Sequence, residues 1–353
     1  MNLTKQILFC ASIFFSANGA IAQEDTIVKA IILDSTETAA DKFYNSGVEA
    51  FGVKKYEEAI TNFSEAIKMN EAFEKAFYNR GLTYFTLDRY AESISDFDKA
   101  ISLREDAETY FKRGEAKQAL KDKDGAIADY KKTVELNASH SKAYYNRAFF
   151  AFQEKEYKTA IEDYTKAIAA KKDFAYAYND RASAKRMLGD FKGAIADYQK
   201  AVMIDNKMAF AHNNLGSAKR KNGDFKGAIQ DYSKAISLDD NYFIAYNNRG
   251  SAKFDAEDYK GAITDFSKAI QINKEYAYAY NNRAAAKFKM KDYKGALEDC
   301  NKAIAIDANY GYAYLNRGNA KELLRDDTGA CEDWHKAVEL GAEGAKANIG
   351  ICN

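Results

Sequence analysis

Small and apolar residues recur along this 353-residue chain at a fixed interval. A glycine or alanine returns every 34 residues, with one interval of 33, in nine successive units. An alanine or serine follows it after 12 residues and an aromatic residue or its substitute after 16. The recurring small residues are Gly47, Gly81, Gly114, Ala148, Ala182, Gly216, Gly250, Ala284 and Gly318.

Each unit predicts two amphipathic helices joined by a turn, because apolar residues spaced three and four apart fall on one helix face. In the seventh unit we expect helices over 242–255 and 260–272, with Asp258 as the N-cap residue of the second. Glycine inside a helix costs about 1 kcal/mol relative to alanine, so we expect Gly250 to lie where the two backbones approach closely, against Ala262. One pair cannot bury its apolar face alone, so the units must stack.

The spacing resembles that of tetratricopeptide repeats (TPR). That family has an aromatic residue, a leucine, a glycine and a tyrosine in the first helix, then A-x3-F and a terminal proline. Here arginine often replaces the leucine, lysine often replaces the tyrosine, and the chain has no proline. The resemblance implies an all-α fold, a right-handed α-solenoid of about nine TPR helix-turn-helix repeats with a short C-terminal capping helix. The aromatic position holds Phe43, Phe77, Tyr110, Tyr144, Tyr178, His212, Tyr246, Tyr280 and Tyr314.

The predicted organisation is a signal peptide over 1–22, a leader over 23–39, nine repeats over 40–344 and a capping segment over 345–353. The repeats start near residues 40, 74, 107, 141, 175, 209, 243, 277 and 311.

The first residues have the pattern of a signal peptide. An apolar run from Ile7 to Phe15 follows Lys5, and Ala20-Ile21-Ala22 forms an A-x-A cleavage site before Gln23. The alternative, a lipoprotein anchored at Cys10, is disfavoured because bulky residues precede this cysteine. We therefore expect an exported protein, periplasmic or extracellular. No later apolar stretch reaches the length of about 20 residues that a membrane-spanning helix needs, so we expect no integral membrane segment in the mature chain.

The TPR resemblance implies that the first helix of each repeat lines a concave groove. If the recurring small residue is counted as position 8, positions 2, 5, 6 and 9 face this groove. From the fifth repeat onward, position 2 is aromatic or apolar, and positions 5 and 6 are mostly asparagine. The predicted peptide-binding residues are Tyr176, Asn179, Phe210, Asn213, Asn214, Asn247, Asn248, Tyr278, Asn281, Asn282, Tyr312 and Asn316.

Two interpretations of this stripe are open. In the peptide interpretation, each asparagine amide pairs its donor and acceptor with the backbone of an extended peptide, and the stripe resembles the asparagine ladder of O-linked GlcNAc transferase repeats. In the packing interpretation, the asparagines hydrogen-bond between neighbouring helices and the tyrosines fill gaps between repeats. A carboxylate clamp for chaperone tails is not expected, because position 5 is never lysine.

Charge and reactive residues restrict the remaining functions. Lysine plus arginine and aspartate plus glutamate number 52 each, so no net field attracts nucleic acid. The three histidines lie in different repeats without metal-ligand spacing, and no nucleotide or hydrolase motif occurs. We therefore expect no metal, no cofactor, no catalytic residue and no nucleic-acid partner. The oligomeric state is not predicted.

Two further pairings are expected. Arginine at position 7 and aspartate at position 23 co-occur in most repeats, which favours an ion pair between the two helices over anion binding by the arginines. Cys331 and Cys352 are candidates for a disulfide, whereas Cys300 replaces a core ring and is expected to be buried.

The predicted function is a protein- or peptide-binding scaffold or adaptor that uses the concave groove and catalyses no reaction. A structural subunit of a cell-envelope or secretion assembly is the alternative.

Overall fold

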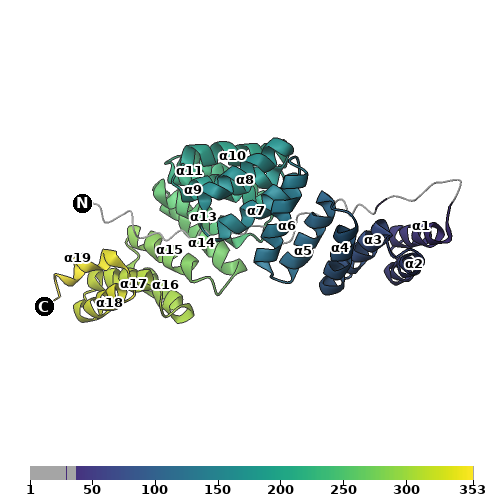
Figure 1. Cartoon of the computed structure of the whole chain (residues 1–353). Helices are drawn as coiled ribbons and strands as arrows, with labels where there is room; N and C mark the ends of the chain where they lie inside the picture. Colours follow the sequence, from purple (N-terminus) through teal and green to yellow (C-terminus); the bar gives the residue numbers. More distant parts are fainter. Residues whose placement is uncertain (1–28, 30–36, 353) are drawn as a thin grey trace. The chain divides into compact units, whose positions relative to one another are not determined.

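The computed structural model describes residues 29 and 37–352 (Figure 1). The regular secondary structure of these residues is entirely helical, with no strand. The helices are α1 (Ala39–Gly52), α2 (Tyr56–Met69), α3 (Glu74–Thr86), α4 (Tyr90–Leu103), α5 (Ala107–Ala119), α6 (Lys123–Leu136), α7 (Ser141–Gln153), α8 (Tyr157–Ala170), α9 (Ala175–Met187), α10 (Phe191–Ile204), α11 (Ala209–Lys221), α12 (Phe225–Leu238), α13 (Phe243–Asp255), α14 (Tyr259–Ile272), α15 (Ala277–Lys289), α16 (Tyr293–Ile306), α17 (Gly311–Leu323), α18 (Asp327–Glu339) and α19 (Lys346–Ile349), with a 3₁₀ turn over Glu343–Ala345 before α19.

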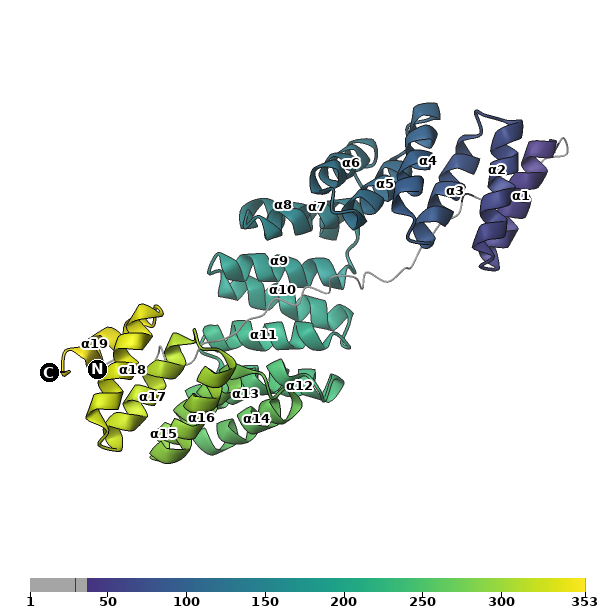
Figure 2. The same cartoon turned by 90° about the horizontal axis from the view of Figure 1, so that it is seen from below.

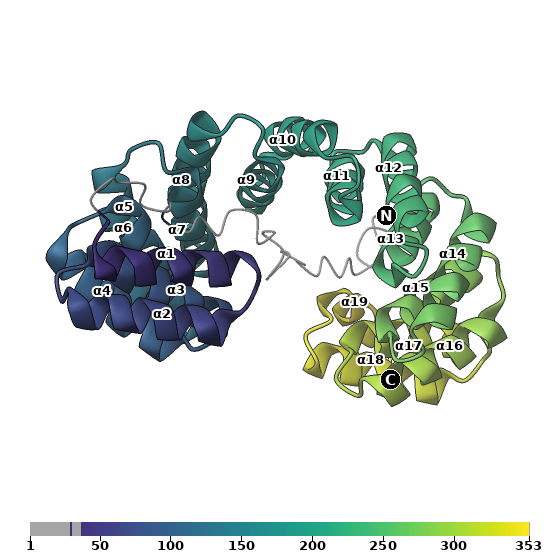
Figure 3. The ribbon, with the colours of Figure 1, turned by 90° about the vertical axis from the view of Figure 1, so that its right-hand side faces the viewer.

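The chain forms two compact units that divide between Ala184 and Lys185, within α9. We call the described residues before this point the N-terminal unit and those after it the C-terminal unit. In the N-terminal unit, α1 to α8 stack in sequence order (Figure 2). In the C-terminal unit, α11 to α18 do the same, and the odd-numbered first helices of successive repeats also contact one another (Figure 3). The expected solenoid-like stacking of helix pairs is confirmed within each unit.

The pair α13 and α14 shows how a repeat is built. The Asp258 carboxylate accepts from the Gly261 backbone N–H at 2.9 Å, which confirms the predicted N-cap. A Cβ atom on Gly250 would lie 2.8 Å from the Phe266 ring and 3.2 Å from the Ala262 carbonyl oxygen. The glycine is therefore required by the buried ring of the second helix as well as by its backbone.

The arginine–aspartate pair is confirmed as a link between the two helices. Arg249 donates to both Asp265 carboxylate oxygens, at 2.9 and 2.7 Å, and Lys253 adds a contact of 2.8 Å to the same carboxylate. Bidentate pairs of this kind are geometrically specific. The sequence did not lead us to the role of the lysine, although lysine recurs at this position. The same arginine geometry joins Arg80 to Asp96, Arg113 to Asp129, Arg147 to Asp163, Arg283 to Asp299 and Arg317 to Asp333.

The C-terminal end is closed by a short cap. The 3₁₀ turn and α19 pack on α18, and a disulfide joins Cys331 to Cys352, with Cα atoms 5.7 Å apart. Cys300 is buried and free. The predicted signal peptide over 1–22, its alternative at Cys10 and most of the leader lie outside the described residues. Of the helices that the structure describes, none combines the length and apolar character needed to span a bilayer.

Candidate functional site

The asparagines at positions 5 and 6 form a ladder between repeats in the C-terminal unit. The position-6 amide of one repeat donates to the position-5 carbonyl oxygen of the repeat before it. The three rungs are Asn248 to Asn213 at 3.0 Å, Asn282 to Asn247 at 3.0 Å and Asn316 to Asn281 at 2.8 Å.

These six side chains are between 0 and 7% exposed. Their amide groups face the neighbouring repeat, which is the arrangement of the packing interpretation. A buried amide that loses such a partner costs about 1–3 kcal/mol, so the ladder holds adjacent first helices at a defined spacing. Its residues link neighbouring first helices, and peptide binding by their own amides stays a prediction.

The remaining stripe residues are placed differently. Phe210, Asn214, Tyr278 and Tyr312 are half-buried. The Tyr278 ring lies 4.9 Å from the ring of Tyr310, so it fills part of the gap between two repeats.

Tyr176 and Asn179 belong to the N-terminal unit. Tyr176 is half-buried, whereas Asn179 is buried and donates to Asp180 at 2.8 Å.

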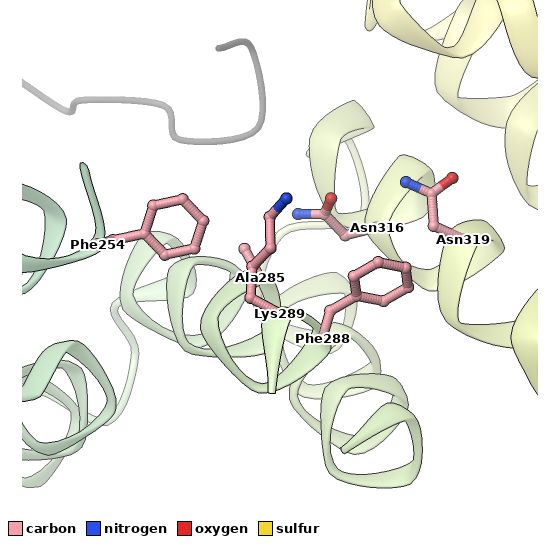
Figure 4. Close-up of a pocket in the computed structure, with 6 residues that line it drawn as sticks. All are labelled: Phe254, Ala285, Phe288, Lys289, Asn316 and Asn319. Atoms are coloured by element: carbon pink, nitrogen blue, oxygen red, sulfur yellow. The ribbon is translucent and has the colours of Figure 1, made fainter. Parts of the chain in front are cut away.

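A hollow lies on the first helices α13, α15 and α17 of the C-terminal unit (Figure 4). Its space, including the part open to solvent, is about 320 Å³. Only one of its residues belongs to the predicted stripe. The lining residues are Phe254, Ala285, Phe288, Lys289, Asn316 and Asn319.

The hollow combines apolar walls with polar groups whose hydrogen-bonding capacity is not fully used. Phe254 and Phe288 are each packed edge-on against the tyrosine that begins the following helix, with ring centroids 5.2 and 5.3 Å apart. Among the described residues, Lys289 makes no ion pair. In Figure 4 its ammonium and the two asparagine amides reach the same open space.

The two asparagines of the hollow are held in place by their other polar atoms. Asn316 donates through Nδ2 to the ladder. Asn319 accepts through Oδ1 from Trp334 Nε1 at 2.9 Å and from Asn348 Nδ2 at 2.8 Å. Within the part of the chain that the structure describes, Asn316 Oδ1 is left as an acceptor and Asn319 Nδ2 as a donor for another molecule.

The sequence contained a signal for these walls that we did not use. Phenylalanine recurs four residues after the small residue, at Phe51, Phe85, Phe152, Phe254 and Phe288. This position lies one helical turn beyond the groove positions that the family resemblance implied, so the hollow was missed.

Comparison with protein families accounts for the repeats. A model described as TPR repeat matches residues 54–88, 182–223, 216–256 and 250–291. Two models described as tetratricopeptide repeat match residues 74–106 and 277–310, and residues 111–173. The chain belongs to the tetratricopeptide-repeat family.

Solved structures of other proteins resemble this TPR chain. A tetratricopeptide repeat protein from Parabacteroides merdae is 18% identical and has a TM-score of 0.57, with 69% of this chain and 97% of that chain covered. The C-terminal part of a TPR repeat-containing protein from Cytophaga hutchinsonii is 20% identical, with a TM-score of 0.56 and coverage of 68% and 98%. MamA is 31% identical, with a TM-score of 0.42 and coverage of 47% and 96%. No curated protein sequence matches the chain.

These comparisons support a protein-interaction scaffold in general, because stacked repeats present extended surfaces rather than enclosed reaction sites. Among the described residues, no group of three or more histidine, cysteine, aspartate or glutamate side chains could hold a metal ion.

Proposed function

We propose that this TPR protein is a protein- or peptide-binding scaffold that works through the first-helix face of its repeats. We propose further that the hollow on α13, α15 and α17 anchors the bound segment. The observation that carries the proposal is the hollow itself, where two aromatic walls lie beside the Lys289 ammonium, which pairs with no carboxylate among the described residues, and beside one open polar atom on each of two asparagines.

Each group in the hollow has a chemical use. The rings of Phe254 and Phe288 can hold an apolar side chain of the ligand. The Lys289 ammonium can pair with a carboxylate, and such charge-assisted contacts are stronger than neutral ones. Asn316 Oδ1 and Asn319 Nδ2 can pair with a backbone N–H and a backbone carbonyl. The proposed ligand is therefore a peptide segment with an apolar side chain beside an acidic one.

The ladder has a different part in this proposal. Its hydrogen bonds fix the spacing of neighbouring first helices, and that spacing sets the width of the hollow. The signal-like pattern of residues 1–22 supports a partner in the periplasm or outside the cell.

The proposal is tested by selecting peptides from a phage-displayed library on the full chain and measuring their dissociation constants by fluorescence anisotropy. Phe288→Ala and Lys289→Glu should each weaken binding by at least about tenfold, about 1.4 kcal/mol. Lys294→Glu is a matched control, because Lys294 is exposed on the following helix. It should change binding less than about twofold, since an exposed charge outside a contact contributes little.

Circular dichroism first verifies that each variant is folded. If the selected peptides bound Phe288→Ala, Lys289→Glu and the wild-type chain with equal affinity, the anchoring point would lie elsewhere.

A further inference from the structure

The backbone at Lys29 lies on the first-helix face of the N-terminal unit, far in sequence from the residues that hold it. Its N–H donates to Asn79 Oδ1 at 2.9 Å. Its carbonyl oxygen accepts from the Tyr44 hydroxyl at 2.6 Å and from Asn79 Nδ2 at 3.2 Å. One asparagine amide thus binds both backbone groups of a single residue, which is how an asparagine recognises an extended peptide.

The Lys29 side chain is held by charge and by an aromatic face. Its ammonium forms an ion pair with Glu74 and lies 3.7 Å from Asp106 Oδ2. The same ammonium lies 4.4 Å from the centroid of the Tyr78 ring. A cation over a tyrosine face gains electrostatic stabilisation that grows as water is excluded. The side chain of Lys29 is only 17% exposed.

The groups around Lys29 are fixed by their own helices. Asp106 caps α5 by accepting from the Thr109 backbone N–H at 3.1 Å. Glu74 begins α3 and also contacts Arg104 at 3.3 Å. Tyr44 is fully buried, and its hydroxyl accepts from Asn79 Nδ2 at 3.0 Å. The site therefore does not depend on Lys29 for its shape.

Asn79 can bind a peptide backbone because position 5 of the preceding repeat is a tyrosine, Tyr44, and not an asparagine. In the C-terminal unit position 5 is asparagine, so the amides of successive repeats pair with one another. In the first two repeats position 5 is tyrosine, at Tyr44 and Tyr78. A hydroxyl uses only the donor group of Asn79, so the amide oxygen is left for a backbone N–H.

We propose that these residues form a binding site for an extended peptide segment that carries a lysine, and that Lys29 of the chain itself is the resident occupant. We call it the lysine site; it consists of Tyr44, Glu74, Tyr78, Asn79 and Asp106. A lysine-bearing segment of a partner binds there by displacing Lys29, so the chain blocks its own site until such a partner arrives. The site lies in the other unit from the hollow and is independent of it.

The test compares the full chain with its Lys29→Ala variant. The probe is a fluorescein-labelled synthetic peptide with the sequence of residues 24–34, and a second peptide carries norleucine in place of the lysine. Lys29→Ala should bind the lysine peptide at least about tenfold more tightly than the wild-type chain, because an attached occupant competes at high effective concentration. It should also prefer the lysine peptide to the norleucine peptide by at least about tenfold.

A second variant separates recognition from folding. Adding Glu74→Gln to Lys29→Ala should weaken binding of the lysine peptide but leave binding of the norleucine peptide unchanged, because the norleucine side chain carries no charge that pairs with Glu74. Glu71→Gln is the matched control, since Glu71 is exposed before the same helix. The proposal is overturned if the lysine peptide fails to bind Lys29→Ala at millimolar concentration. Equal affinity for the two peptides, or equal binding by Lys29→Ala and the wild-type chain, would overturn it as well.

Discussion

Replacing Asp180 with asparagine should stabilise the N-terminal unit at neutral pH and remove part of its pH dependence. Asp180 occupies position 6 of its repeat, where most other repeats carry asparagine. It is 8% exposed, and it accepts from the Tyr145 hydroxyl at 2.6 Å and from Asn179 at 2.8 Å. An asparagine fits this setting, because Asn79 pairs with Tyr44 at the same two repeat positions, with its amide as the donor to the hydroxyl.

The expected magnitude follows from the pKa of Asp180. Burial raises this pKa from 3.8 to about 6, although the two donors oppose the rise. At 1.36 kcal/mol per pH unit, the difference corresponds to about 3 kcal/mol. Because the pKa is higher in the folded state, folding favours the protonated carboxyl. Its stabilising contribution is complete below pH 3.8 and is lost as the pH rises through about 6.

The assay is amide hydrogen exchange in α7 and α9, measured by mass spectrometry from pH 4 to pH 8 after correction for the intrinsic exchange rate. This readout reports local opening, which suits a chain whose repeats contact only their neighbours. The stability of Asp180→Asn relative to the wild-type chain should rise by about 2.4 kcal/mol between pH 4 and pH 8, because the carboxyl of the unfolded chain is already partly ionised at pH 4. Asp173→Asn is the control, because Asp173 is exposed. A difference between Asp180→Asn and wild type that does not change with pH would refute the reasoning.

Two further predictions concern the C-terminal unit. Asn282→Ala removes one rung of the ladder and leaves the buried Asn247 Oδ1 without its donor. Urea unfolding should therefore show that the free energy of unfolding falls by about 2 kcal/mol. A fall below about 0.5 kcal/mol would contradict a structural role for the ladder. The Cys331–Cys352 bridge should contribute about 3 kcal/mol, measured as the effect of Cys352→Ser on the melting temperature. Thiol titration of the unreduced mature protein, which lacks Cys10, should find one free thiol, Cys300, and only after denaturation. Free thiols at Cys331 and Cys352 would contradict the bridge.

Much of the fold was predictable because it depends on contacts within a single repeat. The small residue, the core ring and the N-cap aspartate follow from helical periodicity and from the chemistry of helix ends. The Arg249–Asp265 pair spans 16 residues and one turn, so its two members recur together in the sequence.

Contacts within a single repeat could not predict which way the amides of the ladder point. Positions 5 and 6 were expected to face the groove, but on the first helix they also lie beside the next repeat. Asn248 meets Asn213 across 35 residues, and the packing of one repeat on the next decides which of these surroundings the amide faces. Residue type could not distinguish the two interpretations, because an asparagine amide serves a peptide backbone and another asparagine equally well.

The sequence by itself determined that this chain is a stack of helix pairs, because a pattern repeated in nine registered units leaves one way to bury the apolar residues. Only the tertiary structure decided which side chains of different repeats come together. The hollow needs side chains from three first helices. The proposed occupant of the lysine site, Lys29, belongs to no repeat and meets Asn79 across 50 residues. Periodicity determines the interior that every repeat shares, whereas a binding site is built from the residues in which the repeats differ.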